Sequence, residues 1–107
     1  MSTFVVRLNH SSDQCPRANT KVRERVQSMG AQIPQIAEKA GVKVVIGPLV
    51  LASEHEGVVV VEADRVEAVD DFVTQAGLTH WNAVRVSLAQ PLADALADLS
   101  SVPPPLY

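Results

Sequence analysis

Four strand-like segments arranged around two amphipathic segments constrain the fold of this chain more than any other feature. Apolar and polar residues alternate over residues 3–10, which is the period of a strand with one buried face. Residues 42–50 and 58–63 are rich in β-branched side chains, and residues 81–88 alternate again. We therefore expect four strands at these positions, with a bend where Gly47-Pro48 interrupts the second one.

The first amphipathic segment lies between residues 19 and 40. Its apolar residues recur at intervals of three and four, the spacing of one helix face, and Asn19 or Thr20 is suited to cap its N-terminus. Pro34 lies inside this stripe, where a proline removes a backbone donor and crowds the preceding turn. We therefore expect a helix that is kinked or broken near residues 30–33.

The second amphipathic segment is expected to form a helix over residues 64–77. Asp64 followed three residues later by Glu67 matches a capping box, and Gly77 is suited to end the helix. A shorter helix is expected near residues 92–99, where leucines recur at helical spacing.

The length of 107 residues is that of one compact domain. Hydrophobic residues make up 47% and charged residues 20%, which is typical of a folded chain rather than a disordered one. We expect a single domain over residues 1–100 and a proline-rich tail over residues 101–107, whose Leu106 and Tyr107 dock on a partner subunit.

Charge and hydropathy argue against two classes of partner. Nine Lys and Arg against twelve Asp and Glu give a net charge of −3, without the basic footprint that nucleic acid requires. The longest apolar run, residues 58–61, is too short to span a membrane, and the N-terminus lacks the pattern of a signal peptide. We therefore expect a cytoplasmic protein, in agreement with its single cysteine.

The order of the elements, β-α-β-β-α-β, is typical of ferredoxin-like folds, an α+β class with a four-stranded antiparallel sheet and two helices on one face. Two helices cover only one face of a sheet, yet Val5, Val58 and Val60 alternate onto the opposite face. A face of this kind is typical of the wall of a closed cavity in a symmetric dimer.

The sequence resembles the dimeric α/β-barrel superfamily of small ferredoxin-like proteins over residues 3–92. The similarity rests on the element order and on the segments VVVVEAD, RVEAVDDFVTQAG and HWNAVRVSLAQPL. The superfamily includes muconolactone isomerase-like, YCII-like and antibiotic-biosynthesis monooxygenase-like branches. The resemblance implies a homodimer whose sheets pair into a barrel, with ligands bound in the barrel or between sheet and helices.

Two histidines and the single cysteine form the first candidate site. In a sheet of order 4-1-3-2, His10 at the end of the first strand lies beside His80 at the start of the last, and Cys15 precedes the first helix at the same sheet end. Imidazole and thiolate suit a divalent metal such as zinc or copper, so we expect His10, Cys15 and His80 to bind one. His55, in the hairpin tip, is expected at the opposite end as a surface residue. The alternative is a polar strand-to-helix turn with a packed thiol.

A second candidate site lies on the face away from the helices. A small anionic or oxygenated ligand would bind there to two guanidinium groups, one carboxylate, one amide and one indole. These groups belong to Arg7, Asn9, Glu62, Trp81 and Arg85. The alternative is a structural network in which Glu62 pairs with one or both arginines.

The sequence leaves open whether the protein is an enzyme. Our leading hypothesis is a small homodimer that binds a ligand or a metal ion. The alternatives are an isomerase or a cofactor-free monooxygenase that acts on a small organic molecule in the barrel lumen, and a structural or regulatory dimer without a ligand.

Overall fold

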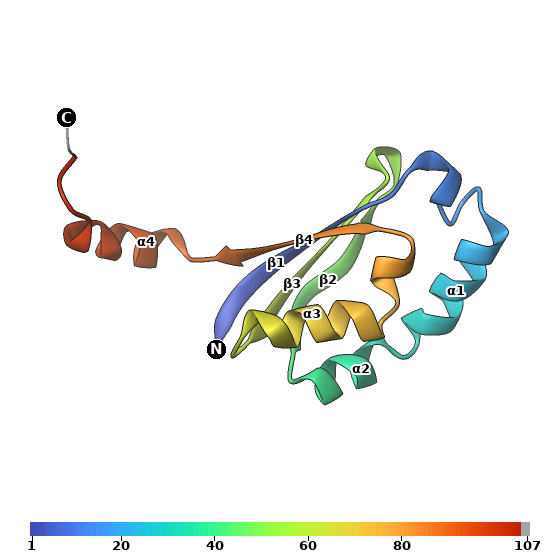
Figure 1. Ribbon diagram of the computed structural model, residues 1–107, viewed down its shortest axis with the longest axis horizontal. Helices are drawn as coiled ribbons and strands as arrows, with labels where there is room; N and C mark the ends of the chain where they lie inside the picture. Colours follow the sequence, from blue (N-terminus) through green and yellow to red (C-terminus); the bar gives the residue numbers. More distant parts are fainter. Residues whose placement is uncertain (106–107) are drawn as a thin grey trace.

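A computed structural model of the chain describes residues 1–105 and shows a four-stranded antiparallel sheet with helices on one face (Figure 1). In spatial order the strands are β2 (Lys43–Leu51), β3 (Glu56–Ala63), β1 (Ser2–Asn9) and β4 (Ala83–Ala89). The helices are α1 (Thr20–Gly30), α2 (Ile33–Ala40), α3 (Val66–Gln75) and α4 (Leu92–Asp98). Short 3-10 turns are η1 (Ser12–Gln14), η2 (Ala52–Glu54), η3 (Leu78–His80) and η4 (Leu99–Ser101). The predicted α+β class and antiparallel sheet are confirmed.

β1 lies in the interior of the sheet, between β3 and β4, and both neighbours run antiparallel to it. Val6 is paired with Val59 of β3 on one side and with Val86 of β4 on the other. Paired residues of an antiparallel sheet share a face, so the even-numbered residues of β1 and β4 point the same way as the odd-numbered residues of β3. This face packs against the helices.

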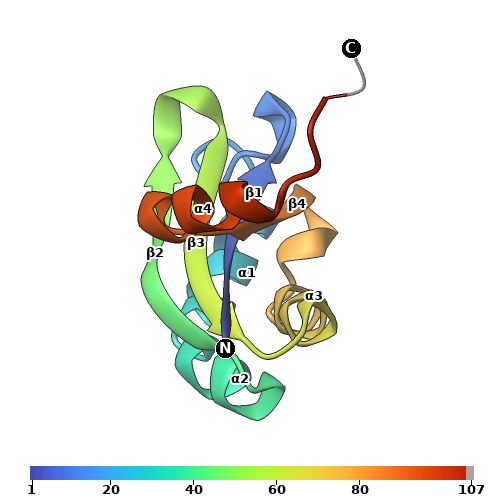
Figure 2. The same ribbon diagram turned by 90° about the vertical axis from the view of Figure 1, so that its left-hand side faces the viewer.

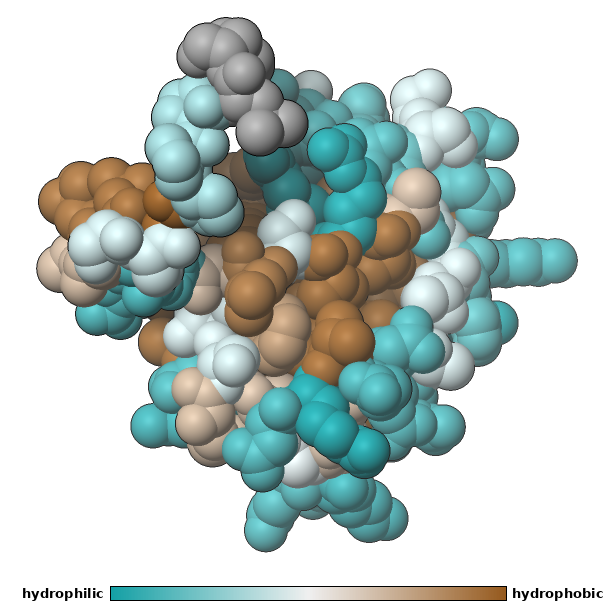
Figure 3. Space-filling view, turned by 60° about the vertical axis from the view of Figure 1, so that its left-hand side comes forward, coloured by the Kyte–Doolittle hydropathy of each residue, from teal (hydrophilic) through white to brown (hydrophobic). Residues whose placement is uncertain are grey.

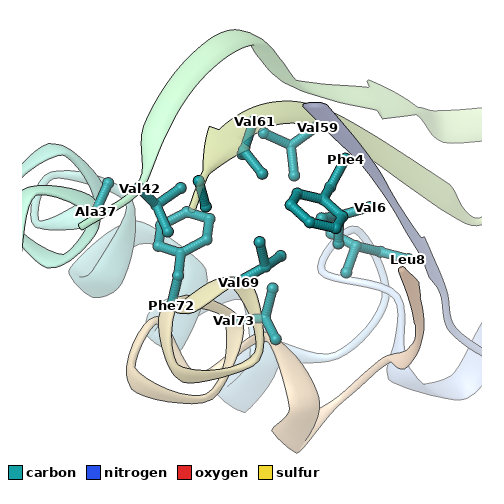
Figure 4. Close-up of a cluster of buried hydrophobic side chains, with 11 residues drawn as sticks. Phe4, Val6, Leu8, Ala37, Val42, Val59, Val61, Val69, Phe72 and Val73 are labelled. Atoms are coloured by element: carbon teal, nitrogen blue, oxygen red, sulfur yellow. The ribbon is translucent and has the colours of Figure 1, made fainter. Parts of the chain in front are cut away.

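The core fills the space between that sheet face and helices α2 and α3 (Figure 4). Val69, Phe72 and Val73 of α3 recur at helical spacing and are almost wholly buried. The sheet adds Phe4, Val6, Leu8, Val59, Val61 and Ala63. Each fully buried valine or phenylalanine contributes about 1.5–3 kcal/mol relative to an exposed one, which makes this cluster the main source of stability.

The predicted helix break near residues 30–33 is confirmed. α1 ends at Gly30 and α2 begins at Ile33, so Pro34 falls in the first turn of α2. Backbone N–H groups of a first turn have no partner within the helix, so proline costs no helical hydrogen bond there. The predicted N-cap is also confirmed, because Asn19 Oδ1 accepts a hydrogen bond of 3.1 Å from the Val22 N–H.

The predicted capping box at Asp64 and Glu67 is wrong. α3 begins at Val66, so the cap position falls on Arg65, whose side chain makes no capping hydrogen bond. Asp64 lies one residue too early in the chain to reach the free backbone N–H groups of the first turn.

The predicted start of the last strand at residue 81 is also wrong, because β4 begins at Ala83. Leu78–His80 form a 3-10 turn after α3, and both the backbone N–H and the side-chain amide of Asn82 donate to the carbonyl oxygen of Leu78. These bonds keep residues 81 and 82 in the turn rather than in the sheet.

The expected bend of the second strand lies at Gly47. The pairing register of β2 with β3 shifts here, and Gly47 adopts φ +88°, which disfavours any residue with a Cβ. A Cβ at this position would lie 2.7 Å from the Leu49 nitrogen and 2.8 Å from the Val58 carbonyl oxygen. The bend therefore requires glycine.

α4 leaves the end of β4 and projects away from the sheet (Figures 1 and 2). The molecule extends 54 Å along its longest axis but only 32 and 19 Å along the other two. The predicted C-terminal helix is confirmed, whereas Leu106 and Tyr107, which we expect to dock on a partner, lie outside the described residues. Among residues 1–105, no helix combines the length and apolarity that crossing a membrane requires.

Two valines of α3 provide a matched test of this core. Val73→Ala removes two buried methyl groups and is expected to lower the free energy of unfolding by about 2 kcal/mol. Val66→Ala makes the same chemical change at a position that is 48% exposed and is expected to stay within about 0.5 kcal/mol of the parent. Urea denaturation measures both. Equal losses from the two variants would contradict this description of the core.

Candidate metal centre

The end of β1 and the tip of the β2–β3 hairpin meet at one edge of the molecule. The β1–β3 register pairs Asn9 with Glu56, so the residue after β1 and the residue before β3 are neighbours. The backbone N–H of His10 donates a 3.0 Å hydrogen bond to the carbonyl oxygen of His55. This bond extends the strand pairing and holds the two histidines together.

Three donor groups converge at this edge. One ring nitrogen of His10, one ring nitrogen of His55 and the Cys15 Sγ all lie within 4.8 Å of one another. The two imidazole rings meet edge to face, with centroids 5.4 Å apart and an interplanar angle of 78°. A tetrahedral site places its donor atoms about 3.5 Å apart, so modest side-chain rotations would complete one.

Two of these ring nitrogens have no hydrogen-bond partner. His10 Nε2 and His55 Nδ1 are buried and make no hydrogen bond, and the Cys15 side chain beside them is also buried. A buried polar atom left without a partner costs about 1–3 kcal/mol. Such atoms are uncommon in native structures, so two of them in one cluster make this edge a candidate binding site.

Asn82 orients the His10 ring. Its side-chain NH₂ donates a 3.0 Å hydrogen bond to the carbonyl oxygen of Leu78, which directs Asn82 Oδ1 toward His10. His10 Nδ1 lies 3.3 Å from that oxygen and must carry the proton, because an amide oxygen only accepts. His10 Nε2 is therefore left with a free lone pair. A polar group that holds the second ring nitrogen is typical of histidines that bind metals.

Hydrogen bonds to backbone carbonyls hold the loop that carries Cys15. Asn19 Nδ2 donates to the carbonyl oxygen of Asp13 at 3.0 Å, and the Arg23 guanidinium donates to those of Pro16 and Arg17, each at 2.9 Å. The N-cap residue and the first turn of α1 thus hold the loop through one side chain each.

The loop also contains one perturbed carboxyl group. The Ser11 hydroxyl, which donates a hydrogen bond to Asp13, is the main cause that lowers the pKa of this carboxyl, and backbone and Gln14 hydrogen bonds add to it. A lowered pKa in the folded state means that the contribution of Asp13 to stability is present above its unfolded pKa. It is lost as the pH falls through the lower, folded pKa.

A cavity of about 240 Å³ opens beside two of the three donor residues. It lies between α1, the bend of β2 and Trp81, and both His10 and Cys15 line it. The Trp81 ring contacts that of His10, with centroids 5.1 Å apart. Most of the wall is apolar, so the donors face a poorly solvated space.

The structure corrects the predicted positions of His80 and His55. His80 is exposed in η3, where its Nδ1 accepts a hydrogen bond from Arg25 Nη1, and it is not part of the donor group. His55 was expected at the opposite end of the sheet, which is wrong. In an antiparallel sheet, the hairpin that joins β2 to β3 lies at the end where β1 terminates.

The structure divides the second candidate site. Arg7 and Arg85 are paired across β1 and β4 on the face away from the helices, and Asn9 lies two residues further along β1. Glu62 is paired with Thr3, four residues from Arg7, which is about 13 Å along a strand. Within residues 1–105, no ion pair joins Glu62 to Arg7 or to Arg85. Trp81 lies outside β4 and lines the cavity instead.

Two residues of the site, His55 and Asn82, were missed by sequence reasoning. The signal for His55 was present in the predicted strand order, since an antiparallel order brings the hairpin tip to the end of the first strand. Asn82 carried no comparable signal, because its role depends on the turn that precedes β4. No protein-family model matches this chain, and no curated protein matches it.

The protonation of His10 tests the role of Asn82. In the metal-free protein, neutral His10 is expected in the Nδ1–H form, which long-range ¹H–¹⁵N correlation spectra identify. Asn82→Leu removes the acceptor and is expected to shift the population toward the Nε2–H form. Asn9→Leu, the same change on the exposed outer face, is expected to leave it unchanged. An Asn82→Leu spectrum identical to that of the parent would contradict the assignment.

Proposed function

We propose that this protein binds a divalent transition metal, zinc or copper, through His10 Nε2, His55 Nδ1 and Cys15 Sγ. The observation that carries this proposal is the pair of buried ring nitrogens without hydrogen-bond partners next to a buried thiol. Nitrogen and sulfur donors of this kind suit metals of borderline softness. Binding would relieve the cost of both unpartnered nitrogens.

The charge of such a centre follows from its donors. Cys15 would bind as a thiolate and both histidines as neutral imidazoles, because a metal displaces the proton from each atom that it binds. A divalent ion with one thiolate has a net charge of +1. Three protein ligands leave the fourth tetrahedral position open, as in catalytic rather than structural zinc sites.

The enzyme alternative receives less support. An isomerase or monooxygenase reaction in the barrel lumen would need Arg7, Glu62 and Trp81 to surround one substrate. Glu62 and Arg7 lie at different positions along the strands, and Trp81 lines the cavity beside His10. The cavity next to the donors is therefore the better supported place for a ligand.

We also propose that the chain forms a homodimer of the dimeric α/β-barrel type in the cytoplasm. Apolar side chains are exposed on the edge strand β2, along α4 and at the start of η4: Val45, Ile46, Leu49, Val50, Leu92, Leu96 and Leu99. Figure 3 shows a contiguous hydrophobic area bordered by hydrophilic side chains. α4 projects away from the sheet of its own chain, so a second copy would supply each of these surfaces with an apolar partner.

Metal titration of single variants tests the proposed centre. His10→Ala, His55→Ala and Cys15→Ser each remove one donor and are expected to weaken zinc binding at least about 100-fold, measured by competition with a chromophoric chelator. Affinity in the parent is expected to fall as the pH is lowered, because protons compete with the metal for its donors.

His80→Ala is the matched control, since it removes an exposed histidine outside the donor group. Its zinc affinity is expected to equal that of the parent. The proposal fails if the parent binds no metal, or if His80→Ala weakens binding as much as His55→Ala does.

The homodimer is tested by adding one charge to either side of α4. Leu96 lies in the leucine stripe, and Leu96→Glu is expected to weaken dimerisation at least about tenfold because it would bury an unpaired carboxylate. Ala97 lies about 100° further around the helix, so Ala97→Glu is expected to leave the dimer intact. Sedimentation equilibrium measures both, and a monomeric parent protein would refute the proposal.

A further inference from the structure

The cavity beside Cys15 combines an apolar wall with charged residues at its mouth. Val26 and Met29 of α1 and Leu49 of β2 belong to the apolar wall. Arg17 and Arg25 also line the cavity but are exposed to solvent, which places them at its mouth. A site of this kind suits an amphiphilic molecule whose apolar body is buried and whose polar head stays near water.

Charge constrains the head group of such a molecule. The charged residues of the wall are Arg17, Arg25 and Glu56, and among residues 1–105 no ion pair joins Glu56 to either arginine. Two positive charges against one negative charge leave one positive charge unbalanced, which a monoanion balances. A divalent metal bound by the Cys15 thiolate would add a further positive charge, so the preference for an anion holds with or without the metal.

Hydrogen-bonding capacity identifies the kind of monoanion. Among residues 1–105, Arg17 takes part in hydrogen bonding only through its carbonyl oxygen, and Arg25 donates to His80 through Nη1 alone. A guanidinium group has five N–H donors, so both arginines keep donors for a ligand. A carboxylate matches the planar fork of these donors and carries one charge. A phosphate monoester carries almost two negative charges at neutral pH, more than this mouth balances.

Cavity size constrains the rest of the molecule. An engineered protein cavity of about 150 Å³ holds one benzene ring. The cavity of about 240 Å³ beside Cys15 therefore accommodates one ring or a short alkyl chain. Most of its wall is apolar, so a polar body would lose its hydration without compensation.

We propose that this cavity binds a small monocarboxylic acid with an apolar body, in its ionised form. The body lies among Val26, Met29 and Leu49, and the carboxylate accepts hydrogen bonds from Arg17 and Arg25 at the mouth. No covalent bond forms or breaks on binding. This ligand site goes beyond the proposed metal centre and does not require the metal.

Isothermal titration calorimetry with three probes tests this inference. Phenylacetate has both a ring and a carboxylate, phenylacetamide keeps the ring without the charge, and acetate keeps the carboxylate without the ring. Phenylacetamide and acetate are each expected to bind at least about tenfold more weakly than phenylacetate, because each lacks one of the two contributions.

Variants of the two arginines test the head-group contacts. Arg17→Gln and Arg25→Gln are each expected to weaken phenylacetate binding at least about threefold and to leave phenylacetamide binding unchanged. Arg85→Gln removes an exposed guanidinium on the opposite face of the sheet and is expected to have no effect. His80→Ala removes the hydrogen bond of Arg25 but keeps its charge, so it separates the loss of that bond from the loss of the guanidinium. It is expected to leave phenylacetate binding no weaker than in the parent.

A cavity-filling variant tests where the ring lies. Val26→Trp places an indole in the cavity and is expected to weaken phenylacetate binding at least about tenfold, while its circular dichroism spectrum stays that of a folded protein. Leu88→Trp makes a comparable change at an exposed position on β4 and is expected to have no effect.

Titrations of the protein as purified and after treatment with a chelator separate this inference from the proposed function. The inference is overturned if phenylacetate does not bind, binds no better than phenylacetamide or acetate, or binds the folded Val26→Trp variant as tightly as the parent. Binding that the chelator abolishes would place the carboxylate on the metal and would overturn the assignment to the arginines. Phenylacetate binding by a protein that binds no zinc would refute the proposed function alone.

Discussion

The antiparallel pairing of β1 with β3 and β4 is the interaction on which the rest of the structure depends. It places Phe4, Val6 and Leu8 on the helix-covered face, and a shift of one residue would move all three to the opposite face. The same register carries the backbone hydrogen bond from His10 to His55. One pairing therefore sets both the hydrophobic core and the position of the candidate metal centre.

The break between α1 and α2 divides one apolar stripe between the core and the cavity. The apolar stripe of this region is continuous in sequence, but its two halves contact different parts of the molecule. Ala37 of α2 is buried in the core with α3, whereas Val26 and Met29 of α1 line the cavity beside Cys15. Ile33, at the start of α2, contacts both the core and the cavity. Pro34 permits this division, since it begins a new helix and lets the two axes diverge. The polar atoms of the site thus lie at the margin of the core.

Patterns within a few residues predicted most of the fold, whereas contacts between residues far apart in the chain decided most of the site. The helix break and the Asn19 cap depend on neighbours within a few residues, so they were predictable. The predicted cap of α3 was wrong because the helix starts two residues after Asp64. Sequence patterns locate helix boundaries of this kind poorly. His80 was placed at the start of the last strand because Trp81 and Asn82 continue the alternation of that strand in sequence, yet hydrogen bonds to Leu78 keep them in a turn.

By itself the sequence determined the strands, the helices and their order, because periods of two and of 3.6 residues are properties of short segments. It also supplied the chemistry of the site, since the donors His10 and Cys15 were evident from residue type alone. Only the tertiary structure decided that His55 rather than His80 joins them, and that Trp81 faces the cavity. The physical reason is that these neighbours are set by strand register and by the place where a turn ends. Both depend on contacts between residues far apart in the chain.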